Sequence, residues 1–314
     1  MRLKVFTFVI ALMFGCITQA QEEIVFVPQW TAQSQFAGYY VALEKGFYKK
    51  EGLRVRIEHP YASNSCINLL KDGKCHLITH HLTTAMCHID NGFHLVNVQQ
   101  TSQNSNQMII SHKPIRNIQS LNGMRIGRWK AGFCELAMIL EKQHKLSIEW
   151  IPFIQNVNLF VSGAIDATMA MKYNEYFQLK TSGIRMPSEN LLYFSDIGYN
   201  VPEDGLYTTL EYYKTHQIEV EKFVKATREG WEWAAAHPEE TIDIVMNMTD
   251  YDDVKTNKLV QRWMLREYLN SMIDKKTGKR TYKLEKDALK LANNLLLSSG
   301  FIKKPVTYQQ IVKP

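Results

Sequence analysis

Residues 24–58, IVFVPQWTAQSQFAGYYVALEKGFYKKEGLRVRIE, indicate the fold class more clearly than any other stretch. The run 24–30 is rich in β-branched and aromatic residues, which predicts a strand, and the polar loop 31–35 follows it. Apolar residues at helical spacing over 36–50 predict a helix, and the alternation over 54–58 predicts a second strand. This order is typical of an α/β protein with a mostly parallel sheet and helices on both faces.

The same rhythm continues along the chain and then starts again. Strand-like and helix-like runs alternate as far as residue 99, and a second series extends from residue 108 to residue 209. After residue 215 the chain is almost purely helical. At 314 residues it is long enough for two cores. We therefore predict two α/β lobes joined by a hinge, with a helical C-terminal region: lobe 1 from 21–110 plus 206–314, and lobe 2 from 111–205.

The first twenty residues, MRLKVFTFVIALMFGCITQA, have the organisation of an export signal peptide. Arg2 and Lys4 precede the apolar run Val5–Phe14, which is shorter than the ~20 residues of a membrane-spanning helix. Small residues then offer a cleavage site at Ala20. Alternatively, the preceding glycine and Cys16 loosely resemble a lipoprotein box, and Cys16 would then carry a lipid anchor. We expect the mature chain to be periplasmic or otherwise extracytoplasmic.

Composition and charge exclude several classes of protein. The chain is 45% hydrophobic and 22% charged, which excludes a disordered or collagen-like protein. Loss of the leader lowers the net charge from +6 to +4, and the local basic cluster at 275–280 surrounds a turn. We therefore expect no nucleic-acid partner, since such partners need a basic face with aromatic side chains. Four other cysteines match no zinc spacing, and export leaves disulfides among them open: Cys66, Cys75, Cys87 and Cys134.

Familiar catalytic motifs are absent from the sequence. It contains no P-loop, GxGxxG, GxSxG or HExxH, so nucleotide-fold enzymes and common hydrolases lose their signatures. The most metal-like stretch is 75–88, which contains four histidines and two cysteines. Neighbouring strand residues point to opposite faces, so His80 and His81 cannot both aim at one site. We expect no metal there, but rather a loop histidine in contact with ligand or solvent.

Aromatic and polar residues at strand ends are the candidate binding residues. Trp30 and Trp129 each end a predicted strand, one in each lobe, where parallel strands open a crevice. The two indoles can sandwich a flat ring, although ordinary packing at the lobe interface explains either one equally well. Asn174 and Glu175 can bind ring nitrogens or an amino group, and Asp204 is a weaker candidate. The full candidate set is Trp30, Tyr39, Asn64, Ser65, His81, Trp129, Tyr173, Asn174, Glu175 and Asp204.

Several motifs resemble those of one family. They are VPQW at 27–30, QFAGYY at 35–40, ALEKGFY at 42–48, EGL at 51–53, SLNGMRIG at 120–127, SGAIDA at 162–167 and HPEE at 237–240. In them the chain resembles the thiamine-pyrimidine-precursor family, ABC-importer solute-binding proteins related to eukaryotic thiamine pyrimidine synthases. The resemblance implies a type II periplasmic-binding-protein fold that closes on an aminopyrimidine and delivers it to a membrane permease. Taurine, sulfonate and nitrate binders share the general plan, so such a solute is an alternative ligand.

The related synthases are the alternative from another functional class. They use a lysine to hold pyridoxal phosphate and a nearby histidine as consumed substrate. The resemblance places His80 at the lysine position and Thr84 at the histidine position, and an imidazole cannot form the required imine. The synthases' cysteine-rich iron motif would fall at 199–205, which contains no cysteine. We therefore expect a monomeric binding protein without catalytic residues or cofactor; a periplasmic sensor module is a third alternative.

Overall fold

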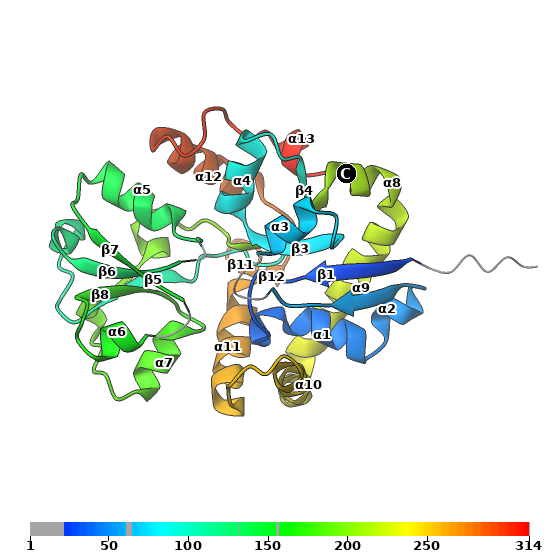
Figure 1. Ribbon diagram of the computed structural model, residues 1–314, viewed down its shortest axis with the longest axis horizontal. Coiled ribbons are helices and arrows are strands. Elements are labelled where there is room, and N and C mark those ends of the chain that lie inside the picture. The colour runs from blue at the N-terminus through cyan, green and yellow to red at the C-terminus, as the bar shows by residue number, and fades with distance from the viewer. Residues whose placement is uncertain (1–21, 61–64, 131, 155–156, 314) are drawn as a thin grey trace, which may run out of the picture.

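The computed structural model describes residues 22–60, 65–130, 132–154 and 157–313. The chain forms two lobes side by side, each built around a five-stranded sheet (Figure 1). The first sheet has the order β2 (Arg54–Ile57), β1 (Glu23–Val27), β3 (Leu77–His81), β10 (Asp204–Thr209) and β4 (Leu95–Gln100). The second has the order β7 (Glu149–Phe153), β6 (Arg125–Trp129), β8 (Ala167–Met171), β5 (Gln107–Ser111) and β9 (Leu191–Tyr193).

Helices cover both sheets. The first lobe contains α1 (Ala37–Glu44), α2 (Phe47–Lys50), α3 (Cys66–Lys71), α4 (Leu82–Asp90), α8 (Leu210–Thr215), α9 (Gln217–Ala236), α10 (Pro238–Tyr251), α11 (Lys258–Ser271), α12 (Lys286–Ser298) and α13 (Tyr308–Ile311). The second contains α5 (Glu135–Gln143), α6 (Asn158–Val161) and α7 (Glu175–Thr181). A short hairpin, β11 (Ile273–Asp274) and β12 (Lys279–Arg280), follows α11, which stands at the boundary between the lobes (Figure 1).

Both sheets are mostly parallel, as expected, because four of the five strands in each run in one direction; one strand in each runs the opposite way and makes the sheet mixed. In the first sheet, β1 is parallel to β2 and β3, whereas β10 is antiparallel to β3 and β4. In the second, β6 is parallel to β7 and β8, whereas β5 is antiparallel to β8 and β9. The chain passes from one lobe to the other and back, and after each passage it enters the sheet with one of these strands: β5 in the second lobe and β10 in the first. The alternation of strands and helices along the sequence does not indicate in which direction such a strand pairs with its neighbours.

The chain crosses between the lobes twice, at 102–106 and 200–203. Strand β5 pairs in the second sheet and β10 in the first, so each crossing ends a few residues before the expected boundary. Glu203 joins the two crossings: its Oε1 accepts hydrogen bonds from Ser105 Oγ at 2.7 Å, Asn106 N at 2.7 Å and Gln107 N at 3.1 Å. The hinge therefore contains a buried carboxyl group between two polar segments.

Packing of α1 against α9 supports the first sheet. Gly38 and Gly230 face each other where these helices touch: a Cβ at Gly230 would overlap the Gly38 carbonyl oxygen, and one at Gly38 would overlap the Trp231 ring. Only glycine permits this approach. The contact fixes α1 beside β1, so that the loop between them is held at the boundary of the lobes.

The structure describes the four cysteines of the expected mature chain, but not the predicted leader. Cys66, Cys75, Cys87 and Cys134 are free thiols in the part of the chain that is described. The predicted leader and Cys16 lie outside the described residues. Among the helices of the described ranges, none combines the length and apolar character that crossing a membrane requires.

Candidate functional site

A small cavity lies between the two lobes. The first lobe contributes the loop after β1 and the end of β3, and the second contributes the ends of β6 and β8 with the segments that follow them. The lining residues are Gln29, Trp30, Gln33, Gln35, His81, Trp129, Phe133, Met171, Tyr173, Asn174 and Glu175. The mixture of aromatic and polar side chains in this lining suits a small planar ligand.

Six of the ten expected binding residues line this cavity: Trp30, His81, Trp129, Tyr173, Asn174 and Glu175. They come from both lobes, and they lie at or just beyond the carboxyl ends of β1, β3, β6 and β8. The strand-end argument brings them together because parallel strands β1 and β3, and likewise β6 and β8, end at the same edge of their sheet.

Three expected residues are placed elsewhere, and the fourth is not among the described residues. Tyr39 belongs to the core, where its ring stacks on Phe26 with centroids 4.4 Å apart, because α1 packs this face against the sheet. Ser65 is exposed at the start of α3, and Asn64 lies outside the described residues. Asp204 is behind the lining side chains and bonds to two of them.

Sequence reasoning missed five lining residues: Gln29, Gln33, Gln35, Phe133 and Met171. The three glutamines lie in or beside the polar loop after β1, so the argument that selected Trp30 applies to them too. Phe133 has φ of +62°, in a segment between β6 and α5 where no periodic pattern identifies it. Its ring lies 4.6 Å from that of His81 and 6.3 Å from that of Trp30, measured between centroids.

Glu175 supplies a carboxyl group to the wall from the second lobe. Its Oε1 accepts a hydrogen bond from Trp129 Nε1 at 2.9 Å, and its Oε2 accepts one from the Met171 backbone N–H at 2.8 Å. Burial raises the pKa of Glu175, while these two hydrogen bonds lower it. Remaining lone pairs of the carboxyl group are suited to an N–H donor on a ligand.

Trp30 is held in place from the first lobe. His59 Nδ1 lies 2.5 Å from the Trp30 carbonyl oxygen, and its Nε2 lies 2.8 Å from the Tyr40 hydroxyl. Burial lowers the pKa of His59 to about 4. The neutral ring can donate to the carbonyl from Nδ1 and accept from the hydroxyl at Nε2. Next to Trp30, the Gln29 backbone N–H donates to Thr79 Oγ1 at 2.9 Å, which ties the loop to β3.

The two adjacent histidines point in different directions, but both are buried at the end of a strand and not in a loop. His81 lines the cavity, and burial lowers its pKa. His80 instead stacks on His88 of α4 with ring centroids 5.6 Å apart, and burial lowers its pKa strongly. Within the described ranges, no three His, Cys, Asp or Glu side chains are grouped as metal ligands.

Direct contacts join the lobes around the cavity. Thr84 Oγ1 and Thr83 Oγ1, on α4, donate to Glu135 at the start of α5, at 2.8 and 3.3 Å. On the other side, Trp263 Nε1 of α11 donates to the Lys172 carbonyl oxygen at 3.0 Å. The structure is therefore a closed arrangement of the two lobes.

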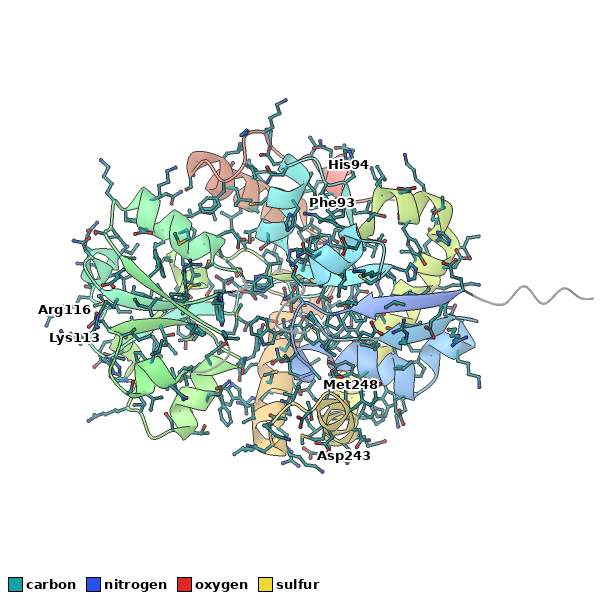
Figure 2. All side chains as sticks on the ribbon, viewed as in Figure 1. Phe93, His94, Lys113, Arg116, Asp243 and Met248 are labelled. Atoms are coloured by element: carbon teal, nitrogen blue, oxygen red, sulfur yellow. The ribbon has the colours of Figure 1, made fainter. Side chains whose placement is uncertain are left out.

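Cationic side chains are absent from the described lining of the cavity. Lys172, next in sequence to a lining residue, forms an ion pair with Glu267 at 2.9 Å. Lys113 and Arg116 lie at the outer end of the second lobe, far from the first lobe (Figure 2). The acidic groups that line the cavity or bond to its lining, Glu175 and Asp204, are carboxyl groups, which favour a neutral or cationic ligand over an anion.

Comparison with known proteins identifies relatives across most of the chain. The family model described as "NMT1/THI5 like" matches residues 33–241. The formylaminopyrimidine-binding protein of Halalkalibacterium halodurans is 23% identical over 267 residues, which cover 79% of each protein.

Solved structures show the same fold. The periplasmic aliphatic sulphonate-binding protein SsuA of Escherichia coli superposes with a TM-score of 0.68 at 13% identity, covering 94% of this chain and 93% of that one. The desulfurization enzyme DSZB gives a TM-score of 0.62 at 13% identity, covering 94% and 97%. The predicted periplasmic-binding-protein fold is confirmed, and this fold by itself does not distinguish binding from catalysis.

Proposed function

The chain belongs to the NMT1/THI5-like family, and from this membership we propose that it captures an aminopyrimidine precursor of thiamine for an ABC importer. The ligand enters between the lobes, which close over it by rotation about the two crossings. Trp30 and Trp129 flank its ring, and Asn174 and Glu175 bind its polar edge. The closed protein then presents the ligand to a membrane permease.

One observation supports this ligand most strongly: the described cavity lining combines aromatic rings with a buried carboxyl group and contains no lysine or arginine. A planar ring can stack on indole, and an amino group or protonated ring nitrogen can donate to Glu175. The name of the Halalkalibacterium relative points to a ligand of the same chemistry.

Sulfonate and nitrate are poorer candidates on the same ground. A buried anion needs cationic or N–H donors, because its desolvation is otherwise uncompensated. Glu175 and the nearby Asp204, 2% and 1% exposed, instead place negative charge around the ligand. The likeness to SsuA is therefore a likeness of fold and carries no argument for a sulfonate ligand.

A synthase activity is also disfavoured by the residues present. His80 stands at the position where the resemblance places the synthase lysine, but it faces His88 and is absent from the described lining. Thr84, at the histidine position, bonds to Glu135 across the lobe boundary. Neither side chain offers a primary amine to a cofactor aldehyde.

Equilibrium titration of the purified mature protein tests the proposal. Because Trp30 and Trp129 line the cavity, intrinsic tryptophan fluorescence and calorimetry report binding together. We expect saturable 1:1 binding of 4-amino-5-aminomethyl-2-methylpyrimidine or its N-formyl derivative, and no binding of taurine or nitrate at the same concentrations. Tight binding of an anion alone would contradict the proposal.

Export is a separate part of the proposal and has its own test. We propose that residues 1–20 direct secretion and are removed, or that lipidation at Cys16 anchors the chain outside the cytoplasm. Mass spectrometry of protein from its native host distinguishes a mature chain that starts at Gln21 from an acylated one that starts at Cys16. An intact Met1 in cytoplasmic protein would refute both.

A further inference from the structure

Asp204 contacts several cavity-lining side chains without lining the cavity itself. Its Oδ1 accepts a hydrogen bond from Gln29 Nε2 at 2.7 Å, and its Oδ2 accepts bonds from Gln35 Nε2 at 2.6 Å and the Tyr268 hydroxyl at 2.9 Å. His81 Nε2 lies 3.5 Å from Oδ1. Asp204 thus connects three residues of the first-lobe wall: Gln29, Gln35 and His81.

A carboxylate only accepts hydrogen bonds, and this sets the orientation of each group that bonds to it. Gln29 must therefore direct its side-chain NH₂ group at Asp204. Its side-chain carbonyl oxygen, Oε1, is then the atom that can accept a hydrogen bond from another donor. Within the described part of the chain, Gln29 Oε1 is buried and has no hydrogen-bond partner. An unpaired buried carbonyl is costly unless a ligand supplies a donor.

His81 follows the same logic. With its Nε2–H directed at Asp204, a neutral His81 carries its lone pair on Nδ1. This Nδ1 is also buried, and no described residue bonds to it. The Oε1 atom of Gln35, by contrast, already accepts a hydrogen bond from Gln33 Nε2 at 2.5 Å. Two acceptors of the first-lobe wall, Gln29 Oε1 and His81 Nδ1, therefore remain for a ligand.

The backbone holds Asp204 firmly in this position. Its N–H donates to Ser102 Oγ at 2.9 Å, and its carbonyl oxygen accepts the Thr101 N–H at 2.8 Å. Residue 204 is the first of β10 and follows the hinge carboxyl of Glu203. Because the backbone is fixed, we expect a change at this side chain to alter hydrogen-bond direction rather than position.

We infer that Asp204 is a positioning residue that makes the first-lobe wall an acceptor surface, so that the site selects ligands with N–H donors toward both lobes. Glu175 supplies the acceptor on the opposite wall. The ligand class is a planar amino-heterocycle with at least two donor groups, and analogues that present a carbonyl oxygen to Gln29 are rejected. This inference rests on the proposed function for the place of the ligand.

The Asp204→Asn variant tests the inference because the two side chains have the same shape. Oδ2 receives two close donors, whereas Oδ1 receives the Gln29 amide and lies 3.5 Å from His81 Nε2, so the new NH₂ group is best placed at Oδ1, facing Gln29 and His81. The Gln29 amide then turns over and directs its NH₂ into the cavity. His81 Nε2 then also faces an NH₂ group, so a neutral His81 carries its proton on Nδ1, and both acceptors of the wall become donors.

The readout is a ratio of two affinities, measured by calorimetry. The ligands are 4-amino-5-aminomethyl-2-methylpyrimidine and its 4-oxo counterpart. We expect the wild type to prefer the amino compound, and Asp204→Asn to lower this preference at least tenfold. Glu203→Gln is the matched control: it removes a neighbouring buried carboxyl that bonds to the hinge, and it should keep the wild-type ratio.

Each outcome decides a different point. An unchanged ratio in folded Asp204→Asn, or an equal change in Glu203→Gln, overturns the inference but leaves the proposed function standing. A wild type that binds neither pyrimidine overturns both. If Asp204→Asn does not fold, Gln29→Met replaces it, since this variant removes the acceptor directly; the inference then requires the same loss of preference.

Discussion

At the scale of single residues, the cavity is defined by groups that accept hydrogen bonds. Glu175 does so with a carboxyl group whose oxygens are already held by Trp129 and Met171, which prevents it from turning away from a ligand. A hydrogen bond to a charged group contributes about 1.5–3 kcal/mol, compared with about 1 kcal/mol for a neutral one. The charge of Glu175 should therefore dominate the affinity for a donor-bearing ring.

The Glu175→Gln variant should bind the aminopyrimidine about 10- to 100-fold more weakly, because the amide lacks the charge and presents one donor to the ligand. Calorimetric titration measures this change. Glu141→Gln is a close control: Glu141 also accepts from an indole, Trp150 Nε1 at 2.7 Å, and from the Ile148 backbone N–H at 3.1 Å, outside the cavity. Equal losses in both variants would show that Glu175 acts only on stability.

The sequence predicted some of the residues around the cavity and missed the role of others. Trp30, Trp129 and Glu175, which line the cavity, were predicted because each lies at or shortly after a strand end, where a short pattern is informative. The role of Asp204 was not found, since it depends on Gln29 and Tyr268, which are 175 and 64 positions away in sequence. Such pairings arise from tertiary packing and leave no local periodicity.

At the scale of elements, α4 and α5 meet across the lobe boundary through Glu135. Thr84→Val keeps the shape of the side chain and removes one donor to this carboxyl group. We expect the ligand affinity to fall about fivefold, since a lost hydrogen bond costs about 1 kcal/mol of the closed form. Titration measures it. Thr181→Val, whose hydroxyl bonds only to carbonyls within its own helix α7, should leave the affinity unchanged, and a similar fall there would contradict the prediction.

The hinge carboxyl makes stability depend on pH. Burial raises the pKa of Glu203 from 4.5 to about 8. The native state then binds more protons than the unfolded state between these values, so the free energy of unfolding falls as pH rises through this window. His59, with its pKa lowered to about 4, acts in the opposite sense and only below about 6.5, where stability falls as pH falls.

Urea unfolding of the wild type and of Glu203→Gln at pH 6.5 and pH 8 isolates Glu203 by difference, because the buried histidines with lowered pKa values titrate equally in both proteins. We expect the wild type to lose about 1–2 kcal/mol relative to the variant over this interval, from 1.36 kcal/mol per pKa unit. Glu203→Gln should lose clearly less, because the amide does not titrate and can still accept from Ser105 and Asn106 through its oxygen. A wild-type loss that persists in Glu203→Gln would assign the pH dependence to other groups.

The elements also show where sequence patterns are sufficient. The first strand, the helix after it and the C-terminal helices were predicted because their periodicity is local. The antiparallel insertion of β5 and β10 was not predicted, because strand direction follows from how the chain returns through the hinge. This insertion places Asp204 beside His81 in the register, and so it also shapes the site.

At the scale of the whole molecule, two crossings and a set of polar contacts such as those of Glu135 and Trp263 hold the lobes, and ligand between them should shift the balance toward closure. Small-angle scattering should give a smaller radius of gyration with aminopyrimidine than without it. At a ligand concentration that saturates the wild type but lies well below the dissociation constant of Glu175→Gln, this variant should stay at the ligand-free value. Identical wild-type curves with and without saturating ligand would contradict hinge closure.

The most direct measurement is a crystal structure of the mature protein grown with 4-amino-5-aminomethyl-2-methylpyrimidine. We predict electron density for the ring between Trp30 and Trp129, with an amino group against Glu175 and a second donor against Gln29. A cavity without the ring at saturating ligand, a ring bound elsewhere, or an anion held in its place would contradict aminopyrimidine capture.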